Sequence, residues 1–408
     1  MVEDTLYSFD KIFDYEVPTE LINEAKEGSR VKIPFGKGNR ERVGVIFELF
    51  EKEDDEELKK IVSVIDREPV LSKEMLLLAK WMQNRYFCTY FDAIKVMIPA
   101  GLRYKMREVY TLGAKISENN EFFSFVNEKA REKEELFEKF NLDEKKISDL
   151  VKEEILKRTS EPYRPVGDAT KRKVRILPFD ESMLTPKQQM LYFCLMDIGE
   201  VSVKEACYYS GVSEGVVNTL VKKGAAEFFT QEIFRNPYED IFESDNEEIS
   251  LSNAQQKVFN ALCEKYTEKS DKPALLYGVT GSGKTSVYLK LIDKVLSDDK
   301  GVIVMVPEIS LTPQTVAIFK RRYGNRVAVF HSALSMGERL DEFKRVLSGE
   351  ATIAIGTRSA VFAPVKNLGL IVMDEEQEYT YKSEMNPKFH ARDVAKFRSS
   401  YNGALLLL

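Results

Sequence analysis

The sequence predicts a multidomain α/β protein whose C-terminal part is a parallel sheet with a phosphate-binding loop. Its 408 residues are enough for about two to four domains, each with its own core. Apolar runs at 302–306, 352–355 and 370–373 alternate with helical stretches, which is typical of a parallel sheet covered by helices. Before them, "GVTGSGKT" (278–285) lies between an apolar run and a helical pattern, as a phosphate-binding loop requires.

The composition is that of a soluble globular protein. Hydrophobic residues make up 43% and charged residues 31%, and no apolar stretch approaches the roughly 20 residues of a membrane helix. The start, "MVEDTLYSFD", is acidic and lacks a secretory signal, so we expect a cytoplasmic protein with no membrane partner. The net charge of -6 does not exclude a nucleic-acid partner, because a basic groove requires only local clustering of Lys and Arg.

The cysteines argue against a zinc site and against a disulfide framework within this chain. They are widely scattered and no two have CxxC spacing: Cys88, Cys194, Cys207 and Cys263. We expect them to be small buried hydrophobic residues.

The first segment, residues 1–103, has the pattern of a small β-rich domain closed by a helix. Short β-like runs with turn signals between them come first: "SRVKIPFG", "ERVGVIFELF" and "KKIVSVID". The helical stretch "SKEMLLLAKWMQNRYF" follows them.

The second segment, residues 104–238, has a pattern that predicts a winged-helix domain. It begins with two helical stretches, "EFFSFVNEKAREKEELFEKFN" and "DEKKISDLVKEEIL". Three short helices follow, "TPKQQMLYFCLMDIG", "VKEACYYSG" and "SEGVVNTLVKKG", the last with Ser213 as its N-cap, and then the strand-like "AAEFFTQEIFRNP". The third helix of such a domain can contact DNA or another protein. An acidic linker, 239–250, leads to the last segment, 251–408.

The phosphate-binding loop fits the pattern GxxxxGK[ST] at Gly278, Gly283, Lys284 and Thr285. Its glycines let backbone N–H groups surround phosphates, Lys284 is expected to meet the β and γ phosphates, and Thr285 is expected to hold Mg²⁺. The remaining nucleotide-contacting positions of the loop are Thr280, Gly281 and Ser282.

A second half of this site is predicted at "LIVMDEEQ", about ninety residues after the loop. Asp374 is expected to bind Mg²⁺ through water, and Glu375 to polarise the attacking water. Taken alone, the carboxylates could be a solvated strand end. Together with the loop they predict a catalytic site of Lys284, Asp374 and Glu375.

The motifs between these two halves resemble a known family. They are "VPEISLTPQ" (306–314), "FHSALSMGER" (330–339) and "GTRSAVFAP" (356–364), and the set is similar to the primosomal protein N′ family of replication-restart DNA helicases, in superfamily 2. The resemblance covers the whole chain, because the first segment matches that family's 3′-DNA-end-binding domain at "FDYEVP", "RVKIPFGKGNRERVGVI" and "IPAGLR". It implies that residues 251–408 form the first RecA-like P-loop helicase lobe.

The resemblance also implies which residues bind nucleotide and DNA in this lobe. Gln255 falls where the family places the glutamine that reads adenine, so ATP is the expected nucleotide. Pro307, Gln314, Thr357 and Arg358 fall in segments that face single-stranded DNA, with packing as the alternative for Pro307. The stretch after the carboxylates resembles an aromatic-rich loop that senses DNA through Tyr379, Tyr381, Phe389 and His390; a plain surface loop is the alternative.

In the first segment, the resemblance implies a pocket for the 3′ end of a nascent strand. Phe13, Asp14 and Tyr15 match that pocket, and Lys59 lies in the matching "ELKKIVSVID" segment. An aromatic ring can stack on the terminal base, and a carboxylate can accept a hydrogen bond from the 3′ hydroxyl.

The sequence departs from the family pattern in two places. Gln377 stands where the family usually has histidine, which makes the coupling of hydrolysis to movement less certain. The sequence ends at "GALLLL", before the next helicase motif, so we interpret it as an amino-terminal fragment with a truncated lobe. The second lobe's arginine and the paired cysteines that bind Zn²⁺ in the full-length family are therefore not in this chain.

The resemblance implies an ATP-dependent DNA helicase that recognises stalled or abandoned replication forks and initiates primosome assembly for replication restart. Its expected cofactors are ATP and Mg²⁺. Its expected partners are forked DNA with a 3′ end, single-stranded DNA, primosome proteins and single-stranded-DNA-binding protein. Two alternatives stay open: a fork-DNA and nucleotide-binding module without motor activity, and a superfamily 2 translocase that moves along duplex DNA without separating strands.

Overall fold

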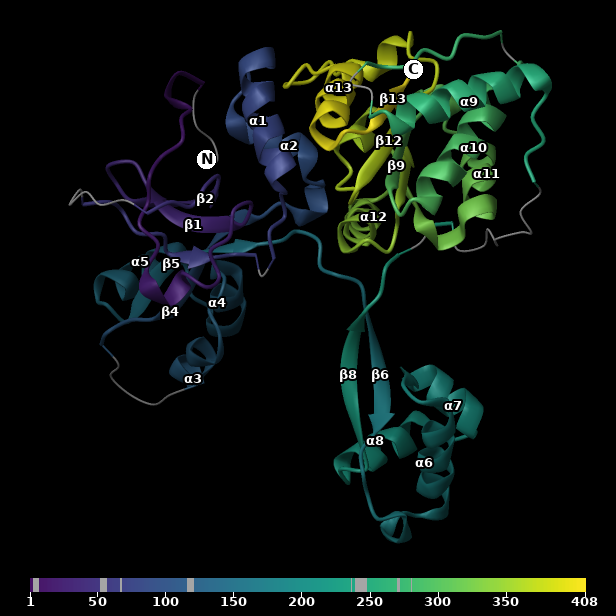
Figure 1. The fold of residues 1–408 in the computed structure, drawn as a ribbon. Coiled ribbons are helices and arrows are strands. Elements are labelled where there is room, and N and C mark those ends of the chain that lie inside the picture. Colours follow the sequence, from purple (N-terminus) through teal and green to yellow (C-terminus); the bar gives the residue numbers. More distant parts are fainter. Residues whose placement is uncertain are drawn as a thin grey trace. The chain divides into compact units, whose positions relative to one another are not determined.

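The computed structural model describes residues 1–2, 7–51, 57–66, 68–115, 121–235, 237–238, 248–269, 272–279 and 281–408. These residues divide into two compact units (Figure 1). The larger unit consists of Met1–Val166 and Tyr238–Leu408, and the smaller unit of Gly167–Pro237.

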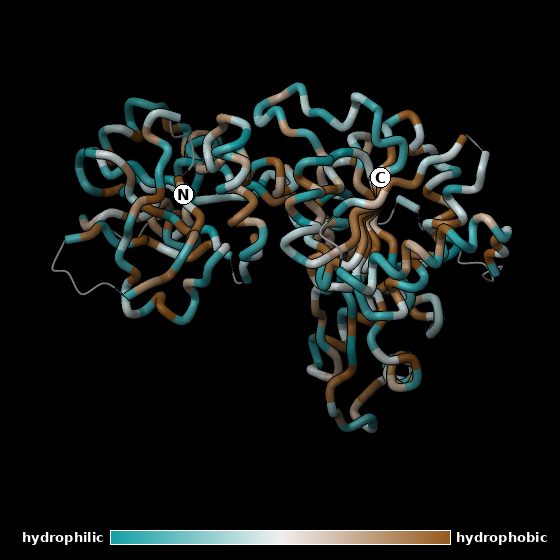
Figure 2. The backbone as a smooth tube through the Cα atoms, turned by 45° about the horizontal axis from the view of Figure 1, so that its top comes forward, coloured by the Kyte–Doolittle hydropathy of each residue, from teal (hydrophilic) through white to brown (hydrophobic). Residues whose placement is uncertain are grey.

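A parallel sheet in the order β10-β11-β9-β12-β13 forms the centre of the larger unit. Its strands are β9 (Gly301–Met305), β10 (Val327–Phe330), β11 (Ile353–Gly356), β12 (Leu368–Met373) and β13 (Leu405–Leu407). Every residue of these strands is buried, and Figure 2 shows them as a hydrophobic bundle beside the C-terminus. A strand buried on both faces reads as a continuous apolar run, so the parallel sheet predicted from such runs is confirmed.

Helices cover both faces of this sheet. They are α9 (Asn253–Thr267), α10 (Lys284–Ser297), α11 (Pro313–Tyr323), α12 (Met336–Ser348) and α13 (Ala391–Asn402). Successive side chains of β9 point to opposite faces: Val302 and Val304 pack with α9, α10 and α11, whereas Ile303 and Met305 pack with α12 and α13. Short 3₁₀ helices occupy the connections: η5 (Glu308–Ser310), η6 (Gly324–Arg326), η7 (Arg358–Phe362) and η8 (Tyr379–Tyr381).

The apolar run before the phosphate-binding loop is paired with the sheet at its edge. Ala274 forms an isolated parallel bridge with Leu407, and the Leu276 N–H donates to the Leu408 carbonyl at 2.8 Å. Because β13 is only 3 residues long, the ladder available to this run is short. The loop therefore begins near the carboxyl ends of the parallel strands, where β12 also ends.

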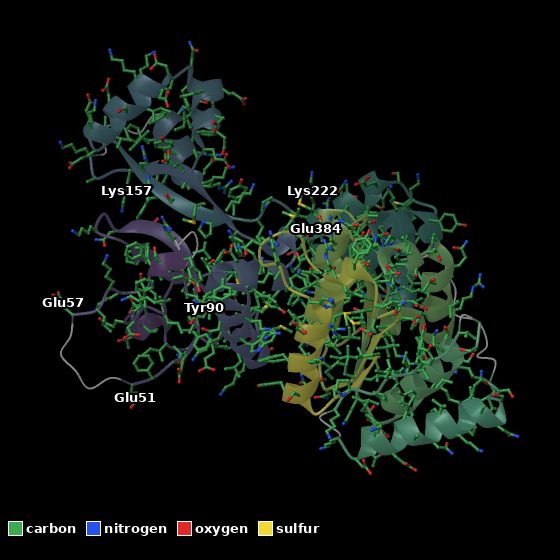
Figure 3. All side chains as sticks on the ribbon, turned by 90° about the horizontal axis from the view of Figure 1, so that it is seen from above. Glu51, Glu57, Tyr90, Lys157, Lys222 and Glu384 are labelled. Atoms are coloured by element: carbon green, nitrogen blue, oxygen red, sulfur yellow. The ribbon has the colours of Figure 1, made fainter. Side chains whose placement is uncertain are left out.

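The N-terminal part of the larger unit contains a small antiparallel sheet in the order β2-β1-β3, which confirms the small β-rich domain. Its elements are η1 (Tyr7–Phe9), η2 (Thr19–Leu21), β1 (Arg30–Phe35), β2 (Arg40–Val45), β3 (Ser63–Val64), α1 (Lys73–Tyr86), α2 (Tyr90–Met97) and η3 (Ala100–Leu102). Glu51 and Glu57, labelled in Figure 3, flank a segment outside the described residues. Helices α1 and α2 share one hydrophobic core with α12 and α13, so the two parts of the unit are packed together.

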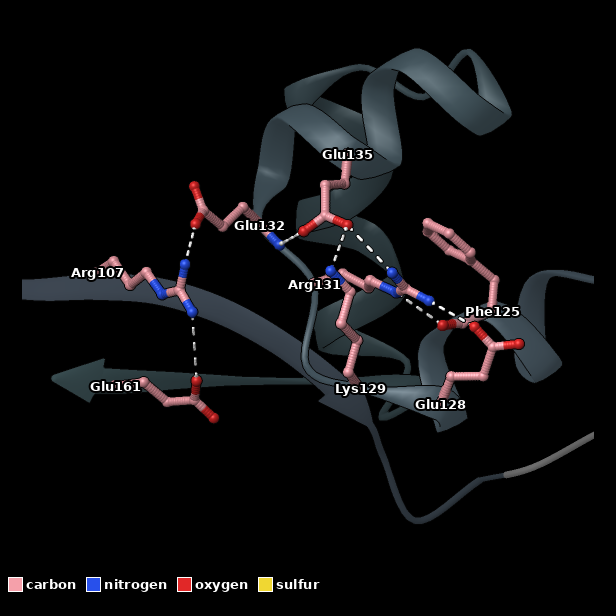
Figure 4. Close-up of polar contacts among 8 residues, drawn as sticks. All are labelled: Arg107, Phe125, Glu128, Lys129, Arg131, Glu132, Glu135 and Glu161. Carbon is pink, nitrogen blue, oxygen red and sulfur yellow. Dashed lines mark hydrogen bonds and ion pairs between the residues drawn. The ribbon is translucent and has the colours of Figure 1, made fainter. Parts of the chain in front are cut away.

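The sequence pattern predicted that residues 105–163 are helical, but the structure also contains two strands in this segment. Strands β4 (Lys105–Leu112) and β5 (Leu156–Tyr163) pair antiparallel and flank helices α3 (Glu121–Glu128), α4 (Lys133–Phe140) and α5 (Glu144–Lys152). The predicted helical stretch 121–141 breaks at Arg131, whose backbone pairs with Tyr110 of β4. Figure 4 shows the Arg131 guanidinium bonded to Glu128 and Glu135, one on each helix that the break separates.

The smaller unit has its own core and an antiparallel sheet in the order β7-β6-β8. Its elements are β6 (Thr170–Ile176), η4 (Glu181–Met183), α6 (Pro186–Ile198), β7 (Val201–Ser202), α7 (Val203–Ser210), α8 (Glu214–Lys222) and β8 (Ala226–Glu232). The three predicted helices and the predicted strand all form. The boundary at Val166–Gly167 falls inside the predicted 104–238 domain, because residues 105–163 build a separate core around Leu136 and Leu156. A winged-helix assignment stays a prediction.

Other predictions have mixed outcomes. The cysteines are free thiols, with Cys88 buried and the other three half-buried, and burial raises the pKa of Cys88 to about 12. Among the described residues, no helix is both long and apolar enough to span a bilayer. Thr280 and most of the acidic linker, 239–247, lie outside the described residues.

Candidate nucleotide and DNA sites

The phosphate-binding loop leads directly into α10, which begins at Lys284. Gly281 and Gly283 have positive φ angles of 79° and 82°, a backbone conformation that residues with a Cβ rarely adopt. A Cβ at Gly283 would also lie 2.3 Å from Nε2 of Gln255. The loop therefore brings bare backbone to the N-terminus of a helix, where N–H groups and the helix dipole favour an anion.

Lys284 lies between the loop and the end of β12. Its Nζ donates to the Gly278 carbonyl at 2.7 Å and is 3.8 Å from Oε1 of Glu375. Lys284 and Glu375, which were predicted for one site, therefore lie close together. Because the ammonium has three donors on a flexible stem, it can turn toward a phosphate without moving the backbone.

Asp374 follows β12 and is fixed by bonds from two directions. Its N–H donates to the Met305 carbonyl at 2.9 Å, which continues the ladder with β9. The Tyr288 hydroxyl, one turn after Lys284 on α10, donates to Oδ2 of Asp374 at 3.4 Å. Burial raises the pKa of Asp374, and the nearby charge of Glu375 raises it further. A cation held here would relieve both effects.

Glu375 has an unusual backbone conformation, with φ of 47°. Such a left-handed residue costs on the order of 1–3 kcal/mol unless it is glycine, and strain of this kind is concentrated at functional sites. The side chain accepts a bond of 2.7 Å from Nε2 of Gln377 at Oε2. Gln377, which departs from the family pattern, therefore holds the carboxylate that is predicted to polarise water.

Gln255 is already bonded at both ends of its amide. Its Oε1 accepts from the Ser252 N–H at 2.8 Å in the capping box of α9, and its Nε2 donates to the Ser282 carbonyl at 3.0 Å. It thus ties α9 to the phosphate-binding loop. Recognition of adenine by Gln255 stays a prediction.

The residues of this site fit a magnesium nucleotide. Mg²⁺ is usually held by one or two protein ligands together with water and phosphate, rather than by a cage of side chains. In the described part of the chain, there is no group of three or more His, Cys, Asp or Glu that could hold a metal by themselves. Asp374 and Thr285, near the Tyr288 hydroxyl, are the predicted protein ligands.

Three of the predicted DNA-binding residues line one groove of about 450 Å³ in the larger unit. Thr357 and Arg358 begin η7, just after β11, and Phe389 comes from the loop before α13. The guanidinium of Arg358 donates to the carbonyls of Thr380 and Lys382 at 3.2 and 3.1 Å. Arg358 therefore holds the predicted aromatic-rich loop from both sides of Tyr381.

Other residues predicted for this interface lie in different settings. Tyr381 and Phe389 are buried, whereas Tyr379 is 79% exposed. The Tyr381 hydroxyl donates to the Asp374 carbonyl at 2.7 Å, so this buried ring contacts the segment of the predicted carboxylates and does not present a face to solvent. The remaining three are His390, which caps α13 through Nδ1; Gln314, exposed in the first turn of α11; and Pro307, buried before η5.

Phe13, Asp14 and Tyr15 line a second pocket, of about 230 Å³, on the small antiparallel sheet. The Phe13 ring packs edge-on against Phe35 at 5.2 Å, and the Tyr15 hydroxyl donates to the Pro34 carbonyl at 3.1 Å. Lys59 is not among the residues that line this pocket; its Nζ donates to the Gly36 carbonyl at 2.6 Å. The geometry brings together three of the four residues predicted to receive a 3′ end.

Tyr288 and the link through Tyr381 were not identified in the sequence. Tyr288 lies four residues after Lys284, and this spacing places both on one face of a helix, so the signal was present. The bond from Tyr381 back to Asp374 depends on the path of an irregular loop, which has no periodic signal.

Comparisons with known proteins match both parts of the larger unit. The PriA 3′DNA-binding domain family matches residues 5–99, and the DEAD/DEAH box helicase family matches residues 252–400. The replication restart protein PriA of Bacillus subtilis is 32% identical over 426 residues, which cover 100% of this chain and 52% of that protein. Its counterpart from Synechocystis is 30% identical, covering 97% of this chain and 50% of that protein. The chain thus spans about half the length of these curated relatives.

Proposed function

The chain belongs to the family of replication restart proteins called PriA, and on that premise we propose that it acts in an ATP-dependent DNA helicase. We propose further that this helicase recognises stalled or abandoned replication forks and initiates primosome assembly. The supporting observation is the joint placement of Lys284, Asp374 and Glu375 at one edge of the parallel sheet, inside the segment that matches helicases.

The side chains of this site have separate roles in the proposed reaction. Backbone N–H groups at the start of α10 and the charge of Lys284 bind and orient the phosphates of ATP. Magnesium ATP supplies the phosphoryl bond whose cleavage drives movement on DNA. Asp374 would help to hold the metal, and Glu375 would accept a proton from the attacking water. Tyr288 keeps Asp374 oriented toward the loop.

Two surfaces support DNA as the substrate. The groove beside η7 offers guanidinium donors from Arg358, which suit phosphates of any sequence, whereas Thr357 in its lining is buried. The pocket at Phe13, Asp14 and Tyr15 combines aromatic rings with a carboxylate, which suits a terminal base and its 3′ hydroxyl. Primosome proteins and single-stranded-DNA-binding protein are the proposed protein partners.

Replacement of Lys284 by Ala tests the catalytic assignment in the intact protein. We expect DNA-stimulated ATP hydrolysis to fall on the order of 100-fold or more, because a preorganised donor to the phosphates is lost. Lys294→Ala is the matched control, since Lys294 lies on the same helix and pairs with Asp298. Unchanged hydrolysis in Lys284→Ala would refute the assignment.

Recognition of a 3′ end is tested by fork binding with a 3′-hydroxyl or a 3′-phosphate terminus. We expect tighter binding of the hydroxyl form, because the Asp14 carboxylate repels a phosphate. The Asp14→Asn variant should reduce the difference in affinity between the 3′-hydroxyl and 3′-phosphate forks, because the repelling charge is removed. Equal affinity of the unaltered protein for both termini would contradict the proposal.

A further inference from the structure

We propose that the groove beside η7 binds the backbone of single-stranded DNA, and that Lys95 and Arg103 of the N-terminal domain form one wall of it. The proposal rests on the proposed function, but it assigns DNA binding to a surface of the first domain that lies apart from the Phe13 pocket. The groove is lined on one side by the lobe, at the carboxyl ends of β10 and β11, and on the other side by α2 and η3.

Two contacts fix the N-terminal wall against the lobe. At one end, η3 packs on α12 so closely that a Cβ at Gly101 would lie 2.8 Å from the Met336 carbonyl oxygen. At the other end, Nδ2 of Asn386 donates to Oδ2 of Asp92 on α2 at 3.0 Å. The backbone of the wall between these contacts is therefore held against the lobe, and the Arg103 guanidinium on it is held by the Ile98 carbonyl at 3.3 Å.

The charges of the groove suit a polyanion. Among the described residues that line it, four are cations, Lys95, Arg103, Arg339 and Arg358, and one, Glu308, is a carboxylate. The guanidinium of Arg339 donates to the Leu334 and Ser332 carbonyls at 2.8 and 3.3 Å, much as that of Arg358 is held by its loop. A guanidinium has five N–H donors, so these bonds orient both arginines and leave donors for phosphate.

The apolar part of the groove favours single-stranded DNA over an acidic peptide. Met385 lines the same groove as the cations and is 77% exposed, so it offers apolar surface to bases, whereas Phe330, Phe362 and Phe389 are buried. Unpaired bases require apolar or aromatic surface next to the cations that hold their phosphates, which is the combination found here. In a duplex the bases are paired and stacked inside the helix, so they would not contact that apolar surface.

The position of the groove also connects it with the nucleotide site. Arg358 on its wall holds the carbonyls on both sides of Tyr381, whose hydroxyl donates to the Asp374 carbonyl. A phosphate that draws the guanidinium away would loosen this loop next to the catalytic carboxylates. Lys95 and Arg103 would hold the strand against Arg358 from the opposite side.

The test is the binding of oligo(dT) to the full chain by fluorescence anisotropy, at several salt concentrations. We expect Lys95→Gln with Arg103→Gln to weaken binding on the order of 10-fold and to reduce the salt slope by about 1.4, since each phosphate contact with a single strand contributes about 0.7. Lys73→Gln, an exposed lysine at the start of α1, is the matched control. Because the Arg103 guanidinium bonds to the Ile98 carbonyl, Lys95→Gln alone serves if the double variant unfolds, with about half that slope change.

The outcomes separate this inference from the proposed function. If Arg358→Gln weakens oligo(dT) binding while the Lys95 and Arg103 variants bind normally, the N-terminal wall is refuted and DNA binding by the lobe stands. If the unaltered chain does not bind oligo(dT), the proposed function itself is contradicted. Displacement of oligo(dT) by poly-glutamate at equal charge concentration would overturn the choice of DNA in favour of an acidic peptide.

Discussion

At the scale of one residue, the surroundings of the Asp374 carboxyl group bear on the proposed metal site. Its carboxyl group is buried next to Glu375, and both effects raise its pKa above the ordinary value of 3.8. Without a cation, the ionised form therefore destabilises the folded protein. A bound Mg²⁺ would turn the same position into a favourable one, so the cost is tied to function.

Replacement of Asp374 by Asn should raise the thermal stability of the metal-free protein at neutral pH. The neutral amide removes a buried charge that the folded state disfavours. The sign follows from the raised pKa of Asp374 in the folded protein. As pH rises from the pKa of the unfolded state through the higher pKa of the folded state, the ionised carboxylate increasingly destabilises the fold. Below the pKa of the unfolded state, the carboxyl group is neutral in both states and this destabilisation is absent. The gain in Tm should therefore shrink on acidification, which calorimetry over a pH series measures. A loss of Tm at pH 7 would contradict this explanation.

Residues of the site were predictable where the chemistry fixes a short pattern. Gly283, Lys284 and Asp374 could be found because a phosphate cradle and a metal-binding strand end need particular residues at particular spacings. The second bond of Gln255 and the contacts of Arg358 could not be found, because each depends on a backbone carbonyl brought close by tertiary packing. The sequence pattern does not show which backbone carbonyl will lie within hydrogen-bond distance of a given side chain.

At the scale of elements, the junction of α1 and α13 contains a buried ion pair. Arg398 is fully buried and donates to Oε1 of Glu74 at 2.6 Å and to the carbonyls of Val361 and Ala363. The pair joins the N-terminal domain to the helicase lobe, and both ends of the guanidinium are satisfied. Removal of one partner leaves a buried charge without its counterion.

Replacement of Glu74 by Leu should destabilise the larger unit by about 3–5 kcal/mol, because the Arg398 charge stays buried without a carboxylate. The double variant Glu74→Leu with Arg398→Met should recover most of that loss, since two apolar side chains pack without a charge. Urea unfolding of the single and double variants measures the difference. Equal destabilisation by both would show that the ion pair is not the origin of the effect.

Elements were predictable where one face is strongly apolar. The buried strands β9, β11 and β12 are uninterrupted apolar runs, and α6 and α7 begin with capping boxes and end at glycine. Strands β4 and β5 are mostly charged or polar and only partly buried, with the sequences "KMREVYTL" and "LKRTSEPY". Apolar residues therefore recur neither at every second position, as in a strand, nor at every third or fourth, as in a helix. Their pairing with each other decides their structure, and that pairing is not local.

At the scale of the whole molecule, the chain consists of two units with separate cores. The smaller unit is built around Leu191, Leu195, Val217 and Leu220, and it extends from Gly167 to Pro237. A unit with its own core is expected to unfold as one cooperative transition. The border between the two units at Val166 could not be read from the sequence, because both halves of 104–238 are helical in pattern and helix periodicity does not show which helices share a core.

Residues 167–237 should therefore fold when produced alone. Circular dichroism should show a cooperative thermal transition, and Leu195→Ala should destabilise this segment by about 2–5 kcal/mol through a core cavity. Met190→Ala is the matched control, because Met190 lies on the same helix but is 59% exposed. A segment without a cooperative transition would show that this unit depends on the rest of the chain.

The central claim is that the loop 278–285 and the carboxylate of Asp374 hold one magnesium nucleotide jointly. Titration calorimetry of ATP binding, with and without Mg²⁺, tests it on the unaltered chain and on Asp374→Asn. The account predicts that Mg²⁺ tightens ATP binding to the unaltered chain and that this gain is lost in Asp374→Asn. An equal Mg²⁺ gain in both proteins would contradict it.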